Sequence, residues 1–381
     1  MKIVLVGPVY PFKGGIAHYT TSLAKQIIQE GHDLHVFSYN RQYPAWLYPG
    51  KSDRDSSQNM YDVKAEFTID TLNPISWLVT FKAIEQIKPG LVIFQWWTTY
   101  MAFVFFCISK LLSTRNIPTC FLIHNIYPHE IHWFDPLLTK ISLQSSNLFI
   151  VQSQKELEKL KRLLPRAKTY FHPHPNYNLV EVNLIDKSTA KRRIGLNPEL
   201  PVLFFFGIVR PYKGLSLFLN AIAELKEQGV IVQGLVAGEF WENPQYYQRL
   251  IDKLGIANLV TIDNRYVPNE ELDLFFSAAD MLIAPYFSGT QSGVIKLAVG
   301  YKMPLIISRA IAEDSMKENT LIEIFETGDV YSLTAAIQKT LDKGNKYFLK
   351  TKSSEENYNW HSLVLLIESI FAEVQPTINQ R

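Results

Sequence analysis

Short, uninterrupted apolar runs recur along this sequence, and most are followed by a stretch with helical spacing. The first two runs are KIVLVG at residues 2–7 and DLHVFSY at residues 33–39, and the helical stretch HYTTSLAKQIIQEG separates them. Runs that are apolar throughout, with little alternation, are typical of strands buried on both faces. Such strands belong to parallel sheets covered by helices, so the alternation predicts an α/β fold.

The alternation occurs in two series. The first series ends with the run NLFIVQS, and the second begins with VLFFFGIV at residues 202–209. Between them, residues 165–200 are rich in proline, asparagine and charged side chains, which is typical of a connection between domains. The sequence therefore predicts two Rossmann-like domains, residues 1–175 and 176–360, whose parallel sheets face a central cleft.

Composition narrows the possibilities. A chain of 381 residues has room for two domains, and residues 361–381 are expected to form a C-terminal helix packed toward the first of them. Cys107 and Cys120 offer neither a disulfide framework nor a metal-ligand spacing, which fits a reducing, cytosolic setting. The net charge of +2 gives no indication of a nucleic-acid partner.

One apolar stretch, from Leu91 to Leu112, is about as long as a membrane-spanning helix. Gln95 interrupts it, and LVIFQ has the character of a buried parallel strand, so a strand followed by a buried helix is favoured. A helix that lies on a membrane surface is the alternative.

Ligands of open parallel sheets bind beyond the carboxyl ends of the strands, so functional residues are expected in the turns after strands. Gly14 and Gly15 precede a helix start, where glycines let a ligand approach backbone N–H groups, although an ordinary loop has the same pattern. His124 follows the run TCFLI in a position that faces the expected cleft, although a structural histidine is the commoner case. No pair of histidines with a carboxylate has a metal-binding spacing, so no metal site is expected.

Two turns in the second series could receive a dense negative charge. Arg210 and Lys213 flank a Pro-Tyr turn at a helix start, which suits a diphosphate, whereas a solvated basic turn is the plainer interpretation. After the run DMLIAPY, small polar residues lead into another helix, and their N–H and hydroxyl groups suit phosphate oxygens. These residues are Gly289, Thr290, Gln291, Ser292 and Gly293.

In their order along the chain, these motifs resemble those of the retaining glycosyltransferases of family 4, the group 1 glycosyl transferases with the GT-B fold. The order is strand–Gly-Gly–helix, HN after an inner strand, RPYKG at the start of the second domain, AAD–strand–PY, and a glycine-rich loop. It covers nearly the whole chain, and VRPYKGL with SAADMLIAPY is its most specific part. The resemblance implies an N-terminal acceptor-binding domain and a C-terminal domain that binds a nucleotide sugar.

By this resemblance, the protein would transfer a sugar from a UDP- or GDP-sugar with retention of configuration, and would need neither a metal nor another cofactor. Arg210 and Lys213 would stabilise the departing diphosphate, His124 would contact the transferred sugar, and Gly14 and Gly15 would approach the phosphate from the first domain. The other donor contacts would come from the loop Gly289 to Gly293 and from the backbone at Arg265, Tyr266 and Val267.

The resemblance further implies a sugar, polysaccharide or lipid-linked acceptor, as in polysaccharide or glycolipid assembly. The enzyme would then work in the cytoplasm, at the inner face of the membrane where the acceptor is a lipid. The aromatic-rich stretch from Trp96 to Phe106, with Lys110 and Arg115 nearby, is the expected membrane contact.

The sequence departs from the family pattern at two positions. Ser288 and Lys296 stand where the family usually carries two glutamates, of which the second holds the ribose hydroxyls. A lysine offers hydrogen-bond donors only, so we expect Lys296 to face the donor's negative charge. The usual GG-x-x-E stretch is also replaced, here by SRAIAEDSMKEN. Two alternatives therefore stay open: a protein that binds nucleotide sugars without catalysis, and an epimerase or phosphorylase of the same fold.

Overall fold

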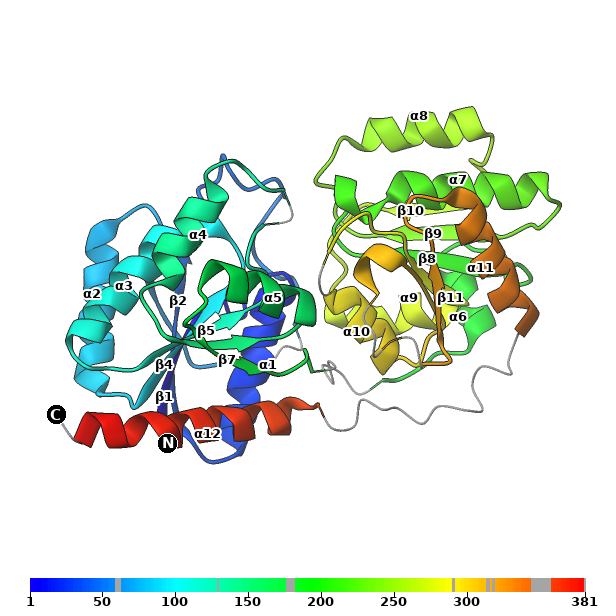
Figure 1. The fold of residues 1–381 in the computed structure, drawn as a ribbon. Helices are drawn as coiled ribbons and strands as arrows, with labels where there is room; N and C mark the ends of the chain where they lie inside the picture. Colours follow the sequence, from blue (N-terminus) through cyan, green and yellow to red (C-terminus); the bar gives the residue numbers. More distant parts are fainter. Residues whose placement is uncertain are drawn as a thin grey trace. The chain divides into compact units, whose positions relative to one another are not determined.

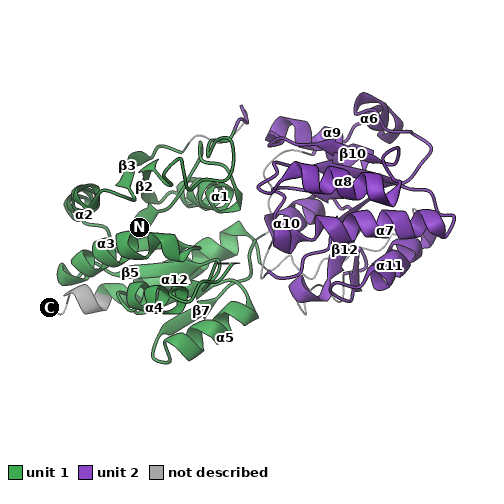
Figure 2. Ribbon diagram, turned by 90° about the horizontal axis from the view of Figure 1, so that it is seen from above, with its two compact units in different colours: residues 1–55, 60–175, 357–381 green, residues 56–59, 176–356 purple. Residues whose placement is uncertain are grey.

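The chain folds into two α/β units (Figure 1). The computed structural model describes residues 1–58, 63–128, 130–175, 182–289, 292–312, 316, 319–343 and 358–379, with only the backbone for 376–379. Unit 1 comprises residues 1–55, 60–175 and 357–381, and unit 2 comprises residues 56–59 and 176–356 (Figure 2). Two short segments differ from the expected domain ranges, because residues 56–59 group with unit 2 and residues 357–360 with unit 1.

Unit 1 is built on a parallel sheet of seven strands in the order β3-β2-β1-β4-β5-β6-β7. Its first strand pairs on both sides, since Ile3 lies opposite Leu34 of β2 and Leu91 of β4. The strands are β1 (Lys2–Val6), β2 (Asp33–Arg41), β3 (Glu66–Asp70), β4 (Leu91–Trp96), β5 (Thr119–Ile123), β6 (Leu148–Val151) and β7 (Lys168–Phe171).

Helices cover both faces of this sheet. They are α1 (Gly15–Gln29), α2 (Pro74–Ile87), η1 (Thr99–Met101), α3 (Ala102–Thr114), α4 (Asp135–Leu143), α5 (Gln154–Leu163) and α12 (Trp360–Asn379). The chain moves along the sheet in one direction through α1 and in the other through α2 to α5, so right-handed crossovers place α1 on the opposite face from the rest. The C-terminal helix α12 packs against α1.

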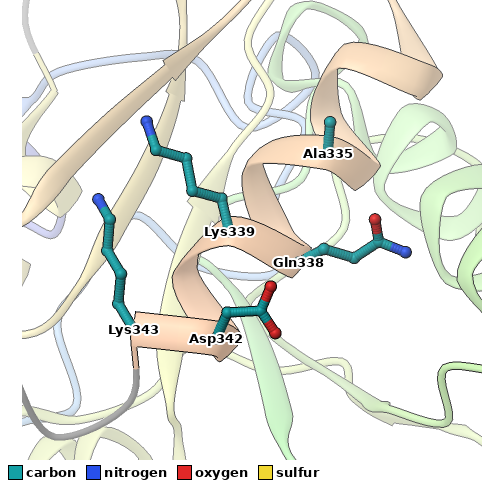
Figure 3. A pocket seen from close by; sticks show the side chains of 5 residues that line it. All are labelled: Ala335, Gln338, Lys339, Asp342 and Lys343. Carbon is teal, nitrogen blue, oxygen red and sulfur yellow. The ribbon is translucent and has the colours of Figure 1, made fainter.

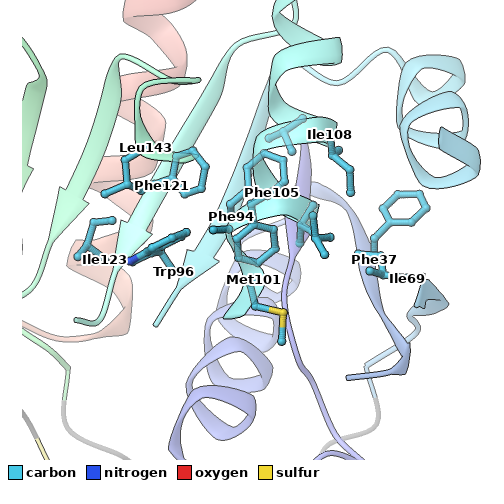
Figure 4. Packing of buried hydrophobic residues seen from close by; sticks show 14 of the residues in the cluster. Phe37, Ile69, Phe94, Trp96, Met101, Phe105, Ile108, Phe121, Ile123 and Leu143 are labelled. Carbon is cyan, nitrogen blue, oxygen red and sulfur yellow. The ribbon is translucent and has the colours of Figure 1, made fainter. Parts of the chain in front are cut away.

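The core of unit 1 on the α2–α5 face is aromatic (Figure 4). Phe94 and Phe121 of adjacent strands stack with ring centroids 5.2 Å apart, and Phe105 of α3 packs edge-on against Phe94 at 5.4 Å. The neighbours in β1 that alternate with this face, Ile3 and Leu5, are also fully buried. Both faces of the sheet are therefore covered, as the unbroken apolar runs predict.

The stretch from Leu91 to Leu112 is divided between the inner strand β4 and helix α3, which confirms the favoured interpretation. Among the described residues, no helix has both the length and the apolar character that crossing a membrane requires. Trp96 and Phe105 are fully buried, so the stretch from Trp96 to Phe106 is mainly core, and its expected role as the membrane contact is wrong for those side chains.

Unit 2 has a parallel sheet of six strands in the order β10-β9-β8-β11-β12-β13. The strands are β8 (Val202–Phe206), β9 (Gln233–Ala237), β10 (Val260–Asp263), β11 (Met281–Ala284), β12 (Leu305–Ser308) and β13 (Ile322–Phe325). The helices are α6 (Lys187–Arg193), η2 (Pro211–Lys213), α7 (Leu215–Glu227), α8 (Pro244–Leu254), η3 (Asn269–Glu271), α9 (Leu272–Ala278), α10 (Gly293–Gly300), η4 (Arg309–Ile311) and α11 (Val330–Lys343).

Alternate residues of the β8 strand enter two separate cores. Leu203 and Phe205 pack with α7, α8 and α11, whereas Val202 and Phe204 pack with α9 and α10. The expected connection at residues 165–200 is more ordered than its composition indicates, because it contains the edge strand β7 and the short helix α6.

Candidate active site

The order of the strands in unit 2 marks one place where a ligand can enter. From β8 the chain passes to β9 on one side and then to β10, and it returns through β11 on the other side of β8. The connections that follow β8 and β11 therefore lead in opposite directions along the sheet, and ligands of open parallel sheets bind at such a switch point. The turn with Arg210 and Lys213 follows β8, and the glycine-rich loop follows β11.

These two loops are packed against each other. The Phe287 backbone N–H donates a hydrogen bond to the Tyr212 carbonyl at 2.7 Å. Gly214 has a φ of 73°, and a side chain there would collide with the Pro285 carbonyl oxygen. Glycine at this position thus permits both the left-handed turn and the close approach of the two loops.

Lys213 is a buried cation at the centre of this arrangement. Its side chain is 9% exposed, and Nζ lies over the Tyr286 ring, 5.5 Å from the centroid. Burial, and to a smaller extent the nearby Arg210 guanidinium, lower the pKa of Lys213 to about 8. In the described part of the chain, no carboxylate forms an ion pair with Lys213. A buried cation without a counter-charge is unfavourable, and a bound anion would relieve that cost.

Gly207, directly after β8, makes room for the Lys213 ammonium. A Cβ atom at Gly207 would lie 3.3 Å from Lys213 Nζ and 3.0 Å from Val294 Cγ2 in the first turn of α10. The bare backbone at Gly207 therefore lets the ammonium group lie close to the start of α10. A cation and a helix N-terminus at one place both favour negative charge.

Arg210 is held by aromatic rings. Its guanidinium carbon lies 5.7 Å from the Tyr212 ring centroid and 5.5 Å from that of Trp241. Trp241 Nε1 donates to Glu239 Oε2 at 3.3 Å, and Glu239 is buried beyond the end of β9. Stacked rings fix the plane of an arginine side chain.

The glycine-rich loop is described at its two ends. Gly289 has a φ of 150°, and a Cβ there would lie 3.1 Å from Ile311 Cγ2. Ser292 is the N-cap residue of α10 and makes no side-chain capping bond, and its Oγ lies 3.5 Å from the Tyr286 hydroxyl. Gly293 begins α10, whereas Thr290 and Gln291 lie outside the described residues.

Lys296 lies in the next turn of α10 and is buried, with 6% of its surface exposed. Its backbone N–H donates to the Ser292 carbonyl at 3.2 Å. Ser288, the other residue at a position where the family usually has a glutamate, is exposed. The departure from the family pattern thus places one buried lysine in the helix that begins at the glycine-rich loop.

The segment from Arg265 to Val267 follows β10. Arg265 donates to Asp263 at 3.0 Å and to both carboxylate oxygens of Glu271, and these bonds raise the pKa of the guanidinium. Val267 is buried in the core of unit 2, and Tyr266 is half-buried. Both side chains that flank Tyr266 are therefore engaged, and the Arg265 backbone N–H donates to the Asp263 carbonyl at 3.0 Å.

In unit 1, Gly14 and Gly15 form the start of α1. Gly14 is the N-cap residue with a φ of 105°, a conformation that favours glycine. A Cβ atom added at either glycine would meet no heavy atom within 4 Å. The first turn of α1 is therefore open to a ligand on the side where these side chains would stand.

His124 follows β5 and is enclosed. Its Nε2 lies 2.7 Å from Gln95 Oε1, and its ring packs edge-on against Tyr19 with centroids 4.7 Å apart. Burial and the nearby His174 ring lower the pKa of His124 to about 3. A neutral imidazole at this position can form hydrogen bonds with a ligand but carries no positive charge near neutral pH.

Comparison with protein families agrees with this architecture. Residues 13–175 match the model of Glycosyltransferase Family 4, and residues 200–343 match that of Glycosyl transferases group 1. The chain belongs to the GT-B glycosyltransferases. The family predicted from the motif order is thereby confirmed.

Solved structures of this glycosyltransferase fold align with nearly the whole chain. Sucrose-phosphate synthase (tll1590) from Thermosynechococcus elongatus superimposes with a TM-score of 0.75 at 16% identity, over 99% of this chain and all of that one. Anabaena Alr3699/HepE in complex with UDP and glucose superimposes with a TM-score of 0.73 at 14% identity, over 98% of this chain and 99% of that one. At these identities the likeness shows the fold.

Curated relatives of this glycosyltransferase match over shorter segments. The D-inositol 3-phosphate glycosyltransferase of Mycobacterium ulcerans (strain Agy99) is 33% identical over 117 residues, 30% of this chain and 25% of the relative. D-inositol 3-phosphate glycosyltransferase 2 of Catenulispora acidiphila is 27% identical over 211 residues, 51% of this chain and 48% of the relative. The matches thus span a quarter to a half of the length of these relatives.

Around His124 the structure gathers residues that the motifs did not indicate. Gln152 of the loop after β6 donates to the Tyr19 hydroxyl, and the rings of His174 and Trp360 pack edge-on against Tyr19 at 4.9 and 5.0 Å. Gln95 could have been found, since it is a polar residue in an otherwise apolar inner strand. The others come from segments far apart in sequence, and no local pattern connects them.

A surface hollow of about 560 Å³ lies on α11, away from the loops that follow β8 and β11 (Figure 3). Its lining residues are Ala335, Gln338, Lys339, Asp342 and Lys343. Lys339 donates to Glu323 Oε2 at 2.8 Å, and Lys343 pairs with the other oxygen of the same carboxylate. Because these lysines already have a counter-charge, this hollow is a poorer anion site than the turn with Lys213.

Proposed function

We propose that the protein transfers a sugar from a nucleotide-diphosphate sugar to an acceptor, with retention of configuration and without a bound metal ion. The observation that carries this proposal is Lys213, a buried cation that pairs with no carboxylate among the residues the structure describes, in one turn with Arg210 at the switch point of the unit 2 sheet. UDP or UDP-glucose in structures of HepE, and the transferase names of the curated relatives, support a nucleotide-sugar donor.

The chemistry explains why cations belong at this point. When the bond between the sugar and the diphosphate breaks, positive character develops on the anomeric carbon and negative charge on the departing phosphate oxygen. Fixed cations and a helix N-terminus beside that oxygen stabilise the transition state more than the ground state. The departing phosphate can accept the acceptor's proton, so no strong base is required of the chain. His124, neutral near pH 7, would hydrogen-bond to the transferred sugar.

The acceptor in this proposal is a sugar, a polysaccharide or a lipid-linked molecule. Binding without catalysis is a second candidate, favoured by Ser288 and the buried Lys296 at the positions of the usual glutamates. A charge reversal at Lys296 tests nucleotide binding, which both candidate functions require. Lys296→Glu should weaken the binding of UDP or GDP if the ammonium group faces the diphosphate, whereas Lys302→Glu, at an exposed site just after α10, should not.

The test of the proposed function is steady-state kinetics with UDP- and GDP-sugars in excess chelator. Removing one donor to a developing negative charge typically costs about 10²–10³ in turnover, so Arg210→Ala and Lys213→Ala should each lower kcat by that order. Arg249→Ala on the exposed surface of α8 is the control and should retain kcat. No turnover of any donor, with intact nucleotide binding, would favour the non-catalytic candidate. Activity lost in chelator and restored by Mg²⁺ or Mn²⁺ would contradict metal independence.

A further inference from the structure

Three neighbouring helices of unit 1 expose apolar side chains toward solvent. Helix α3 packs between α2 and α4, and all three join parallel strands in the same direction, so their axes run side by side (Figure 1). A large apolar side chain is exposed near the beginning of each helix: Ile75 of α2 is 69% exposed, Phe103 of α3 58%, and Trp133, two residues before α4, 90%. An apolar row on the surface of one helix layer is unusual unless something covers it.

A lysine follows each of these side chains at the same spacing. Lys82, Lys110 and Lys140 each stand seven residues after the apolar residue of their segment. On α2 and α3, where both residues are helical, this spacing is about 10 Å along the axis. All three lysines are exposed. The helix layer thus presents a row of apolar groups and, beside it, a row of ammonium groups.

Further exposed apolar residues lie on the same faces of α2 and α4. They are Leu78 and Val79 on α2, and Leu137 and Ile141 on α4. On α2 the exposed set recurs at the spacing of one helix face, and on α4 Leu137, Lys140 and Ile141 do the same. We name the outer faces of α2, α3 and α4, with Trp133, the α2–α4 surface.

Negative charge is nearly missing from the α2–α4 surface. Within the described helices α2, α3 and α4, the carboxylates are Glu85 and Asp135. Glu85 forms an ion pair with Arg115 at 2.7 Å, and Asp135 is buried with 1% exposure. The three lysines therefore give the surface a net positive charge.

We propose that the α2–α4 surface binds an anionic lipid bilayer, with the apolar row in the boundary between headgroups and acyl chains and the lysines at the phosphates. Exposed tryptophan and aliphatic groups beside lysines are the combination that partitions into such a boundary. A second copy of the chain fits less well, because a two-fold contact through this surface would bring two surfaces of net positive charge together. The proposal does not depend on the proposed transferase activity.

The test is flotation with vesicles of phosphatidylglycerol mixed with phosphatidylcholine, and with vesicles of phosphatidylcholine alone. The protein should float with the anionic vesicles and much less with the neutral ones. Lys110→Gln should lower the partition coefficient about fivefold. Trp133→Ser should lower it by roughly tenfold or more. High salt should weaken binding by screening the lysines.

Matched variants on unit 2 are Tyr331→Ser, at a side chain that is 67% exposed, and Lys253→Gln on α8; both should float as the unchanged protein does. UDP or GDP binding by every variant shows that the unit 2 site is intact, independently of the lipid result. Equal recovery with and without lipid would overturn the proposal, and so would flotation that Trp133→Ser and Lys110→Gln leave unchanged. A concentration-dependent dimer that Trp133→Ser abolishes, without flotation, would assign the surface to a second copy instead.

Discussion

His124 Nε2 lies 2.7 Å from Gln95 Oε1, and both side chains are buried in unit 1. Gln95 comes from β4 and His124 from the end of the adjacent strand β5. The sheet itself therefore fixes the position of the histidine ring that the family resemblance assigns to the transferred sugar.

We expect this buried histidine to make stability depend on acidic pH. The pKa of His124 is about 3 in the folded protein, against an ordinary value of 6.5. As the pH falls below 6.5 the unfolded chain gains a proton that the folded chain does not, so the free energy of unfolding decreases by about 1.4 kcal/mol per pH unit from this group. In urea titrations between pH 7 and pH 4, the free energy of unfolding should depend less steeply on pH for His124→Gln than for the unchanged protein. His132→Gln, at an exposed histidine, is the control, and an unchanged slope in His124→Gln would contradict the assignment.

Burying the charged Lys213 should lower the free energy of unfolding, and replacing it with a neutral residue should raise that free energy. The pKa of Lys213 is about 8 when folded and 10.5 when unperturbed, so keeping the ammonium charged at pH 7 costs up to about 3 kcal/mol. Lys213→Met keeps the aliphatic length, and should raise the free energy of unfolding at pH 7. The sign follows from linkage: above pH 8 the folded protein has lost the proton of Lys213, whereas the unfolded chain keeps it up to pH 10.5. The free energy of unfolding of the unchanged protein therefore rises with pH in this range, and its difference from that of Lys213→Met narrows. Chemical denaturation at pH 7 and pH 9.5 measures both values. If Lys213→Met is instead less stable than the unchanged protein at pH 7, an interaction in the folded protein offsets the cost of burying the ammonium group.

The same lysine should make nucleotide binding sensitive to alkaline pH. A diphosphate favours the charged ammonium, so below pH 8 the site is ready to bind, whereas above it binding must first take up a proton. The dissociation constant of UDP or GDP should therefore rise toward about tenfold per pH unit above pH 8. Calorimetric titration at several pH values measures it, and Lys213→Arg should flatten the dependence because a guanidinium stays charged. A flat profile for the unchanged protein would show that Lys213 does not contact the diphosphate.

Local pattern was sufficient for much of the fold. Runs such as KIVLVG and VLFFFG carry no alternation because both faces of each strand are covered, and that signal resides in the residues themselves. The edge strand β7 and helix α6 lacked such a signal, since β7 begins with a charged residue at the sheet margin and α6 is too short for a clear period. Composition alone therefore marked that segment as a connection.

The site was predictable to the extent that single turns define it. Arg210 and Lys213 could be found because a strand, a turn and a helix start are adjacent in sequence. The surroundings of His124 could not, because Tyr19, Gln152 and Trp360 meet it only through the folded chain. The side chains of the expected membrane contact could not be chosen for a similar reason: an aromatic stretch does not reveal that Trp96 and Phe105 face the core while Phe103 is exposed.

Gly207 offers a test of the geometry that holds Lys213 beside α10. Gly207 has a φ of 96°, and a Cβ atom there would stand 3.3 Å from Lys213 Nζ and 3.0 Å from Val294 Cγ2. Gly207→Ala should therefore lose about 1–2 kcal/mol of stability from the backbone conformation and should also displace the ammonium group. Gly195→Ala is the matched control, since Gly195 has a φ of 76° and no heavy atom within 4 Å of its Cβ position. Both variants should lose stability in urea titrations, and only Gly207→Ala should bind UDP or GDP more weakly. Equal affinity in the two variants would show that the position of Lys213 against α10 does not matter for the donor.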